Sequence, residues 1–290
     1  MASVPAWVDR EAYPFDSRFV NLDAGRVHYV DEGDGRPVVF CHGNPTWSFL
    51  YRDLVAGLRD EYRCVALDYL GFGLSEKPPR WTYRPAAHAQ VFEAFLDELD
   101  LEDVTLVVHD WGGPIGLSYA VRNPEAVRAV VVTNSFMWPV EDDRHFRLFS
   151  SLVGGPVGRA LIRRRNAFAT TVMKLAFADR SRLTPAIHRQ YTAPFPTPDS
   201  RKGTWVFPRE ITGSSRWLAS LWERRDALAG TPALLVWGLA DRAFRVAELR
   251  TWEGLFPDAE TVAFEDAGHY VAEEKGTEMV PHVERFLAAT

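Results

Sequence analysis

Cysteine is scarce in this chain of 290 residues, which contains only Cys41 and Cys64. Two thiols without the spacing of a metal or redox motif exclude a disulfide framework and a thiolate cluster. We therefore expect both to be buried, small apolar side chains in a protein of a reducing compartment. No group of His, Cys, Asp and Glu shows the spacing of metal ligands either, so we expect no metal site.

Long apolar runs are also missing. The first residues hold no apolar stretch of signal-peptide length, and no run is long enough to cross a bilayer. We therefore expect a soluble, cytoplasmic protein without membrane attachment. The formal net charge of −6 is modest and argues against a nucleic-acid partner.

Positive charge is concentrated in the middle of the chain. Residues 141–226 carry 16 Lys and Arg against 8 Asp and Glu, whereas the remainder carries 17 against 31. Two interpretations stay open: the block is a solvated face, or its field favours the release of an anion or the docking of a partner.

What the sequence does contain is an alternation of short apolar runs and helical periods, in a chain long enough for one large α/β domain. We expect strands at 18–21, 26–31, 37–41, 63–68, 104–109, 129–134, 233–237 and 261–264, with helices at 49–59, 85–99, 115–123 and 245–255 and a closing helix to 287. This alternation predicts a mostly parallel sheet with helices on both faces. It lapses between residues 137 and 229, an Arg-rich segment that is helical in patches, and we interpret this segment as a lid over the strand ends.

The most informative motif is VVHDWGG at residues 107–113. An apolar run ends in an acid, and Gly112 and Gly113 lead into a helical pattern, which is the strand–turn–helix pattern of a nucleophile elbow. The residue at the apex is Asp110, where an esterase would carry Ser. A carboxylate there can displace a leaving group from a saturated carbon and become an ester itself. Alternatively, Asp110 only ends the strand and caps the helix.

Three further polar residues follow expected strands, where open α/β sheets bind their ligands. Asn44 lies in HGNPTW at residues 42–47, Asp241 follows the strand at 233–237, and His269 follows the last strand. Nucleophile, acid and His therefore occur in the chain order of the α/β-hydrolase triad. Each residue alone could instead form a turn or cap a helix.

With these motifs the chain resembles the haloalkane dehalogenases of the α/β-hydrolase superfamily over nearly its whole length. The matching segments are HGNPTW, HDWGG, WGLAD at 237–241 and the Gly268-His269 turn; in the lid, APFP at 193–196 and SRKG at 200–203 also match. The resemblance implies an eight-stranded, mostly parallel sheet with an inserted helical lid. We expect a main domain at 1–137 and 230–290 and a lid at 138–229.

The resemblance also implies a reaction: a haloalkane and water give an alcohol, a halide and a proton, with no metal or organic cofactor. Asp110 would be the nucleophile, His269 the general base, and Asp241 the acid that orients His269. The indole N–H of Trp111 and the side-chain amide of Asn44 would bind the halide. The backbone N–H groups of Asn44 and Trp111 would form the oxyanion hole.

Several alternatives remain at this stage. Epoxide hydrolases share the nucleophile but need two lid tyrosines, and residues 141–226 contain one, Tyr191. Fluoroacetate dehalogenases would carry Arg after the nucleophile, where Trp111 stands. A coelenterazine-type luciferase and a non-catalytic ligand receptor are two further hypotheses. A receptor would have little need of the complete set of nucleophile, acid and His.

Two departures from the family pattern concern the site. Many relatives place the acid before the lid, near Ser135, where this chain has only the more distant Glu141; Asp241 is therefore the better candidate. Val108 stands two residues before the nucleophile, where serine hydrolases carry Gly, so the turn is expected to pack differently. The sequence does not show which lid residues line the cavity; the candidates are Phe168, Val172, Leu175, Phe177, Trp205 and Trp217. For Trp138 it favours packing in the core.

Overall fold

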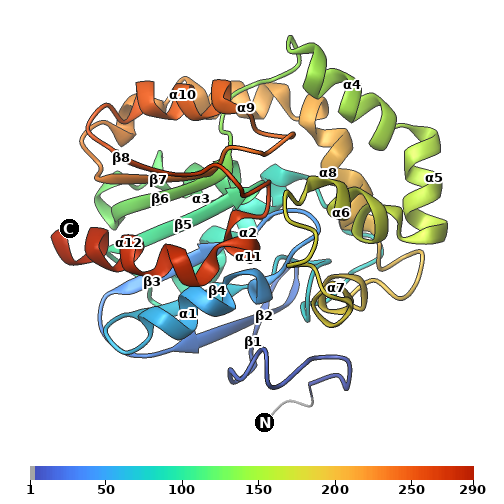
Figure 1. Ribbon diagram of the computed structural model, residues 1–290, viewed down its shortest axis with the longest axis horizontal. Helices are drawn as coiled ribbons and strands as arrows, with labels where there is room; N and C mark the ends of the chain where they lie inside the picture. The colour runs from blue at the N-terminus through green and yellow to red at the C-terminus, as the bar shows by residue number, and fades with distance from the viewer. Residues whose placement is uncertain (1–3) are drawn as a thin grey trace.

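The computed structural model describes residues 4–290 and contains one eight-stranded sheet with the order β1-β2-β4-β3-β5-β6-β7-β8 (Figure 1). The strands are β1 Arg18–Leu22, β2 Gly25–Glu32, β3 Pro37–Cys41, β4 Arg63–Leu67, β5 Val104–Asp110, β6 Val127–Ser135, β7 Ala233–Gly238 and β8 Glu260–Phe264. β1 and β2 pair antiparallel with each other, and β2 with β4, whereas the pairs from β4 to β8 are parallel. The predicted mostly parallel α/β-hydrolase sheet is confirmed.

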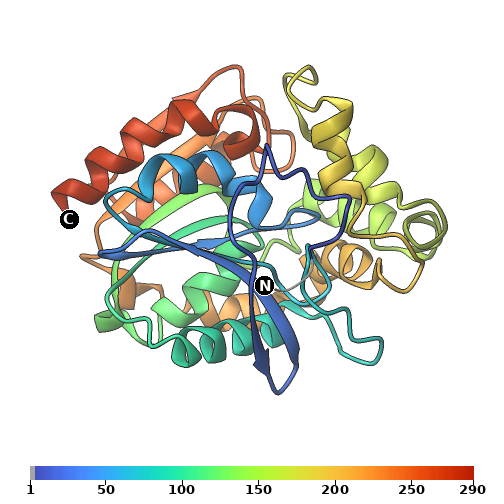
Figure 2. The same ribbon diagram turned by 90° about the horizontal axis from the view of Figure 1, so that it is seen from below.

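The central strands are apolar on both faces because helices cover both. All seven residues of β5 are buried, and their side chains alternate between two cores. Val108 belongs to the core formed with α2 (Pro85–Glu98), α3 (Gly112–Ala120) and α10 (Val246–Leu255). Val107 belongs to the core formed with α1 (Arg52–Leu58) and α12 (Gly276–Ala289), and Figure 2 shows the two layers on opposite sides of the sheet.

In the chain, a block of helices is inserted between β6 and β7. In space it lies beyond the carboxyl ends of the parallel strands (Figure 1). It contains no strand, as the sequence pattern predicted for this part of the chain. Its helices are α4 Arg144–Val153, α5 Pro156–Arg165, a π-helical turn Phe168–Val172, α6 Met173–Ala176, α7 Pro185–Thr192, α8 Lys202–Gly213, α9 Ser215–Trp222 and a 3-10 turn Arg225–Leu228. The lid boundaries 138–229 stay a prediction.

Two expected helices differ in detail. The helix expected at 49–59 divides into a 3-10 turn, Ser48–Tyr51, and α1. The elbow helix α3 ends at Ala120, three residues earlier than expected, because the chain turns there toward Pro124. Short α11, Val271–Glu274, had not been expected as a separate element.

Both cysteines are free and fully buried, as predicted. Among residues 4–290, none of the helices combines the length and the apolar character needed to cross a bilayer. The cytoplasmic location stays a prediction.

Candidate active site

The turn between β5 and α3 is built for close approach of its neighbours. Asp110 has a φ of +51°, a left-handed conformation that is rare outside glycine. A Cβ on Gly112 would overlap the carbonyl oxygen of Cys41, and one on Gly113 would overlap Ser135 Oγ. Glycine at both positions therefore lets α3 begin directly after the strained residue, and the Asp110 side chain projects beyond the sheet.

Val108 is accommodated by a glycine in the following helix. Its side chain is fully buried, and a Cβ on Gly116 would lie 3.2 Å from Val108 Cγ1. Because Gly116 on α3 has no side chain, there is room for the side chain of Val108. The expected difference in packing is found at this contact, and the strand–turn–helix geometry is retained.

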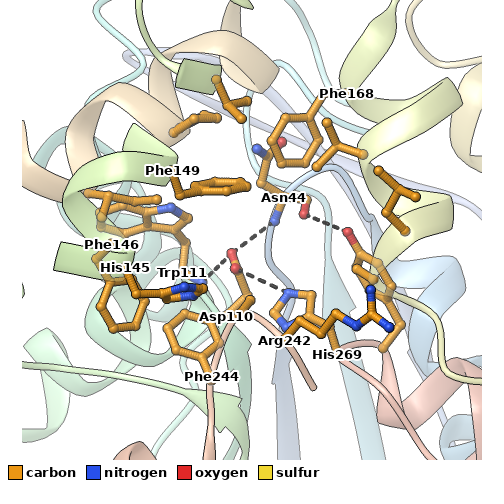
Figure 3. A pocket seen from close by; sticks show the side chains of 18 residues that line it. Asn44, Asp110, Trp111, His145, Phe146, Phe149, Phe168, Arg242, Phe244 and His269 are labelled. Carbon is orange, nitrogen blue, oxygen red and sulfur yellow. Dashed lines mark hydrogen bonds and ion pairs between the residues drawn. The ribbon is translucent and has the colours of Figure 1, made fainter. Parts of the chain in front are cut away.

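The carboxylate of Asp110 is held through one of its two oxygens (Figure 3). Oδ1 accepts hydrogen bonds from the backbone N–H of Asn44, at 3.1 Å, and of Trp111, at 2.6 Å. Oδ2 lies 3.4 Å from His269 Nε2. Burial alone would raise the pKa of Asp110, but the hydrogen bond and charge of His269 outweigh it and lower that pKa. Asp110 is therefore an ionised carboxylate with Oδ2 directed at the cavity side of His269.

The other ring nitrogen of His269 meets the carboxylate predicted for it. Asp241 Oδ2 lies 3.0 Å from His269 Nδ1. Burial would lower the pKa of His269, but the charge of Asp241 and the hydrogen bonds to Asp110 and Asp241 raise it to about 10. These charges and hydrogen bonds favour the protonated form of His269, which lies between the two carboxylates. Glu141 makes no contact with His269 among the hydrogen bonds and ion pairs of residues 4–290.

Asn134 is a site residue that the sequence analysis missed. It follows Thr133, the last residue of β6 that pairs with β7, and its Nδ2 donates to Asp241 Oδ2 at 2.9 Å and to the Gly238 carbonyl at 3.1 Å. The Ala243 N–H donates to Asp241 Oδ1 at 2.6 Å. These donors hold the Asp241 carboxylate against His269 Nδ1. Asn134 directly precedes Ser135, the position already noted for its missing carboxylate, and this was the only signal available.

Two further histidines near the site are bound by the backbone. His42 Nε2 accepts from the Tyr69 N–H at 3.0 Å, and its Nδ1 lies 2.8 Å from the Gly43 carbonyl. His109 Nε2 lies 2.9 Å from the carbonyl of His269. Burial lowers the pKa of both His42 and His109 to about 4, so both are neutral. They support the loops of Asn44 and His269.

A cavity of about 370 Å³ lies over Asp110, between the sheet and the lid, and aromatic and aliphatic side chains form most of its wall. Of the six lid candidates, Phe168, Val172 and Leu175 line it. The others pack elsewhere: Phe177 against Tyr270, Trp205 beneath the guanidinium of Arg159, and Trp217 against the core. Trp138 packs between Trp222 and Trp252, which agrees with the core role favoured above.

Asn44 and Trp111 both line this cavity. The Trp111 ring is held between Phe136 and Phe207, with ring centroids 5.0 and 5.5 Å away. No hydrogen bond among residues 4–290 uses its indole N–H. Asn44 Nδ2 makes one long contact, 3.4 Å to the Thr204 carbonyl. Two N–H donors at the wall of an apolar cavity are thus free, or nearly free, to bind an anion.

The lid tyrosine lies outside this site. Tyr191 is fully buried, and its hydroxyl donates to Glu273, which also binds Arg52. Tyr270 does line the cavity, but its hydroxyl donates to the Asn44 carbonyl at 3.2 Å. No lid tyrosine therefore offers an acidic O–H to the cavity.

The chain from residue 36 to residue 276, which contains β3 to β8 and the lid, matches the family model described as the alpha/beta hydrolase fold. Haloalkane dehalogenase 2 of Mycobacterium tuberculosis is 41% identical over 92% of this chain and 93% of its own length. A cis-3-alkyl-4-alkyloxetan-2-one decarboxylase of Shewanella oneidensis is 34% identical over 96% of this chain and 90% of its own.

Solved structures give the same result. The haloalkane dehalogenase DatA of Agrobacterium tumefaciens superposes with a TM-score of 0.84 at 30% identity, covering 94% of this chain and 96% of its own. A reconstructed ancestral haloalkane dehalogenase superposes with a TM-score of 0.81 at 29% identity, covering 93% and 99%. The chain therefore belongs to the haloalkane dehalogenase family of α/β-hydrolases, the hydrolases that act on carbon–halide bonds.

Proposed function

We propose that the protein hydrolyses haloalkanes in two steps, through an alkyl ester on Asp110. The observation that carries the proposal is the arrangement of the Asp110 carboxylate, with two N–H donors on Oδ1 and His269 3.4 Å from Oδ2. The overall change is balanced: a haloalkane and water give an alcohol, a halide and a proton.

In the first step, Oδ2 of Asp110 attacks the carbon that bears the halogen and displaces the halide. Oδ1 is occupied by the N–H groups of Asn44 and Trp111, so it is suited to become the carbonyl oxygen of the ester. The halide leaves toward the Trp111 indole N–H and the Asn44 amide. Donors fixed in an apolar cavity stabilise developing negative charge far better than mobile water does.

In the second step, water attacks the carbonyl carbon of the ester, and His269 takes its proton. Alkylation removes the negative charge of Asp110, which is one of the causes that raise the pKa of His269. The pKa of His269 must therefore fall once the ester has formed, and this makes His269 available as a base. Oδ1 gains the negative charge of the tetrahedral intermediate while the two backbone N–H groups already bind it. A positioned general base typically accelerates such a step by ~10²–10⁴-fold.

This coupling predicts a shift that NMR can measure. The side chain of Asn at position 110 is uncharged, as the ester is. In Asp110→Asn the pKa of His269 should therefore fall clearly below the value of about 10 that its two carboxylate partners produce. Asp266→Asn, on an exposed side chain, is the control and should leave the His269 titration unchanged. An unaltered His269 pKa in Asp110→Asn would contradict the proposed switch.

The halide donors should be separable from the triad. Trp111→Phe keeps an aromatic ring between Phe136 and Phe207 but deletes the N–H. Losing one such donor typically costs ~2.7–4 kcal/mol of transition-state stabilisation, so halide release should slow accordingly. Bromide binding, followed by tryptophan fluorescence, should weaken in Trp111→Phe and in Asn44→Ala. If both variants bind bromide as tightly as the parent, the halide site lies elsewhere.

The functional test includes two other reactions, the opening of an epoxide and the opening of an oxetan-2-one. An epoxide requires an acid for its oxygen, and the only lid tyrosine is bound to Glu273. A strained oxetan-2-one is a substrate class suggested by the name of the Shewanella relative. A carboxylate nucleophile could open its alkyl C–O bond and expel a carboxylate, which is an anion as a halide is.

The test is a panel of 1-bromohexane, 1-chlorohexane, styrene oxide and a cis-3,4-dialkyloxetan-2-one, assayed with purified protein and no added metal. We expect bromide and acid release from 1-bromohexane, equal with and without a chelator. Turnover of styrene oxide or of the oxetanone without turnover of either haloalkane would replace the proposal by the corresponding reaction.

A further inference from the structure

Two basic side chains stand out in the otherwise apolar wall of the active-site cavity. Arg242 and His145 both line it; in Figure 3, His145 lies on the side of Phe146 and Arg242 on the side of His269. The wall also contains the side chains of Asp110 and His269, which pair with each other. Arg242 is exposed and forms no hydrogen bond or ion pair through its side chain among residues 4–290.

The cavity adjoins a second hollow at the surface, and His145 lines both. Arg144, Arg147 and Arg245 also line this hollow, together with one acid, Asp143. Asp143 is already paired with Arg245, which also binds Glu248. Arg144 and Arg147 are exposed and, like Arg242, form no ion pair with any residue at 4–290.

The exposed arginines therefore make the outer side of the cavity cationic, whereas the buried nucleophile Asp110 lies at its inner end. The exposed, unpaired guanidinium of Arg242 is therefore free to bind an anion that enters the apolar cavity. A guanidinium binds a carboxylate through two parallel hydrogen bonds. Phe146, Phe149 and Phe168 also line the cavity, and such apolar side chains suit an alkyl chain.

We propose that Arg242 binds the carboxylate of an ω-halogenated alkanoate whose carbon–halogen bond lies at Asp110. This inference rests on the proposed dehalogenation and names a substrate class for it: medium-chain alkanoates with a terminal halogen. Arg144 and Arg147 in the adjoining hollow add a positive field that favours entry of such an anion. Arg242 is then a residue that determines specificity, and the basic block of residues 141–226 supplies part of the field.

The test compares ω-bromohexanoate with 1-bromohexane, which differ only in that a carboxylate replaces the terminal methyl group. The measured quantity is the ratio of their kcat/KM values in the intact protein. We expect Arg242→Gln to lower this ratio by about three- to tenfold, because the interaction energy of an exposed charge pair is modest. Arg242→Glu should lower the ratio further, because the reversed charge repels the carboxylate. Added salt should lower the ratio in the parent and have less effect in Arg242→Gln.

Arg250→Gln is the matched control, because Arg250 is exposed on α10 but lines neither hollow; the ratio should not change. Turnover of 1-bromohexane by the parent at the same time verifies the underlying dehalogenation. If 1-bromohexane is turned over and Arg242→Gln leaves the ratio unchanged, Arg242 does not recognise the substrate. If Arg242→Gln instead weakens inhibition by bromide equally for both substrates, Arg242 serves the departing halide, and the proposed substrate class is wrong.

Discussion

Replacing His269 by Phe should leave a protein that releases about one halide per active site and then stops. Alkylation is a displacement at carbon that needs the ionised carboxylate of Asp110 and no base, so it should survive. Hydrolysis of the ester needs a base for water, and among residues 4–290 no other histidine pairs with Asp110: His42 and His109 are bound by backbone groups. Rapid-quench halide measurements should therefore show a burst without a steady state.

Intact-mass spectrometry of the His269→Phe protein after 1-bromohexane should reveal one added hexyl group, and peptide mapping should assign it to Asp110. The matched control is the double variant Asp110→Asn with His269→Phe, which keeps the lid and the cavity but should remain unmodified. Sustained turnover by His269→Phe, or an adduct on another residue, would contradict the proposed division of labour between Asp110 and His269.

The second large effect is expected at Asp241. Asp241→Asn keeps the size of the side chain but removes the charge that accounts for much of the high pKa of His269. Its amide would also face the Nδ2 group of Asn134, which now donates to the carboxylate. We expect steady-state turnover to fall by ~10²–10⁴-fold, the range associated with a positioned base. The melting temperature should be measured alongside, because the buried hydrogen bonds change as well.

Glu141→Gln serves as the comparison for Asp241→Asn. Glu141 is the acid nearest in the chain to the position that many relatives use, yet it makes no contact with His269. Its replacement should alter turnover by less than about twofold, as expected for a residue outside the site. A larger loss of activity in Glu141→Gln than in Asp241→Asn would mean that the catalytic acid lies before the lid.

The parts of the site that local sequence could predict are those that depend on local geometry. Gly112 and Gly113 are needed because any side chain there would overlap Cys41 or Ser135, so the elbow shows itself in the sequence. Asn44 and Asp241 come after strands whose carboxyl ends meet at one edge of the sheet. Their convergence on Asp110 and His269 follows from this topology.

Other parts depend on contacts between segments far apart in the chain. Asn134 reaches Asp241 across 107 residues, because β6 and β7 are neighbours and pair Thr133 with Val236. The lid is harder still: Phe168 and Leu175 face the cavity while Phe177 packs on Tyr270, and all three have similar apolar character. Which helical face meets the sheet is decided by tertiary packing and not by the period of a short helix.

The central claim, an ester on Asp110 that water opens at the carbonyl carbon, is tested most directly with oxygen-18 water and the unaltered protein. With enzyme in excess over 1-bromohexane, each site turns over at most once. The account predicts that the hexanol formed contains ordinary oxygen, taken from Asp110, and that the peptide containing Asp110 gains one heavy oxygen. Hexanol that carries the label, with no label in the protein, would mean that water attacks the substrate carbon directly and would contradict the account.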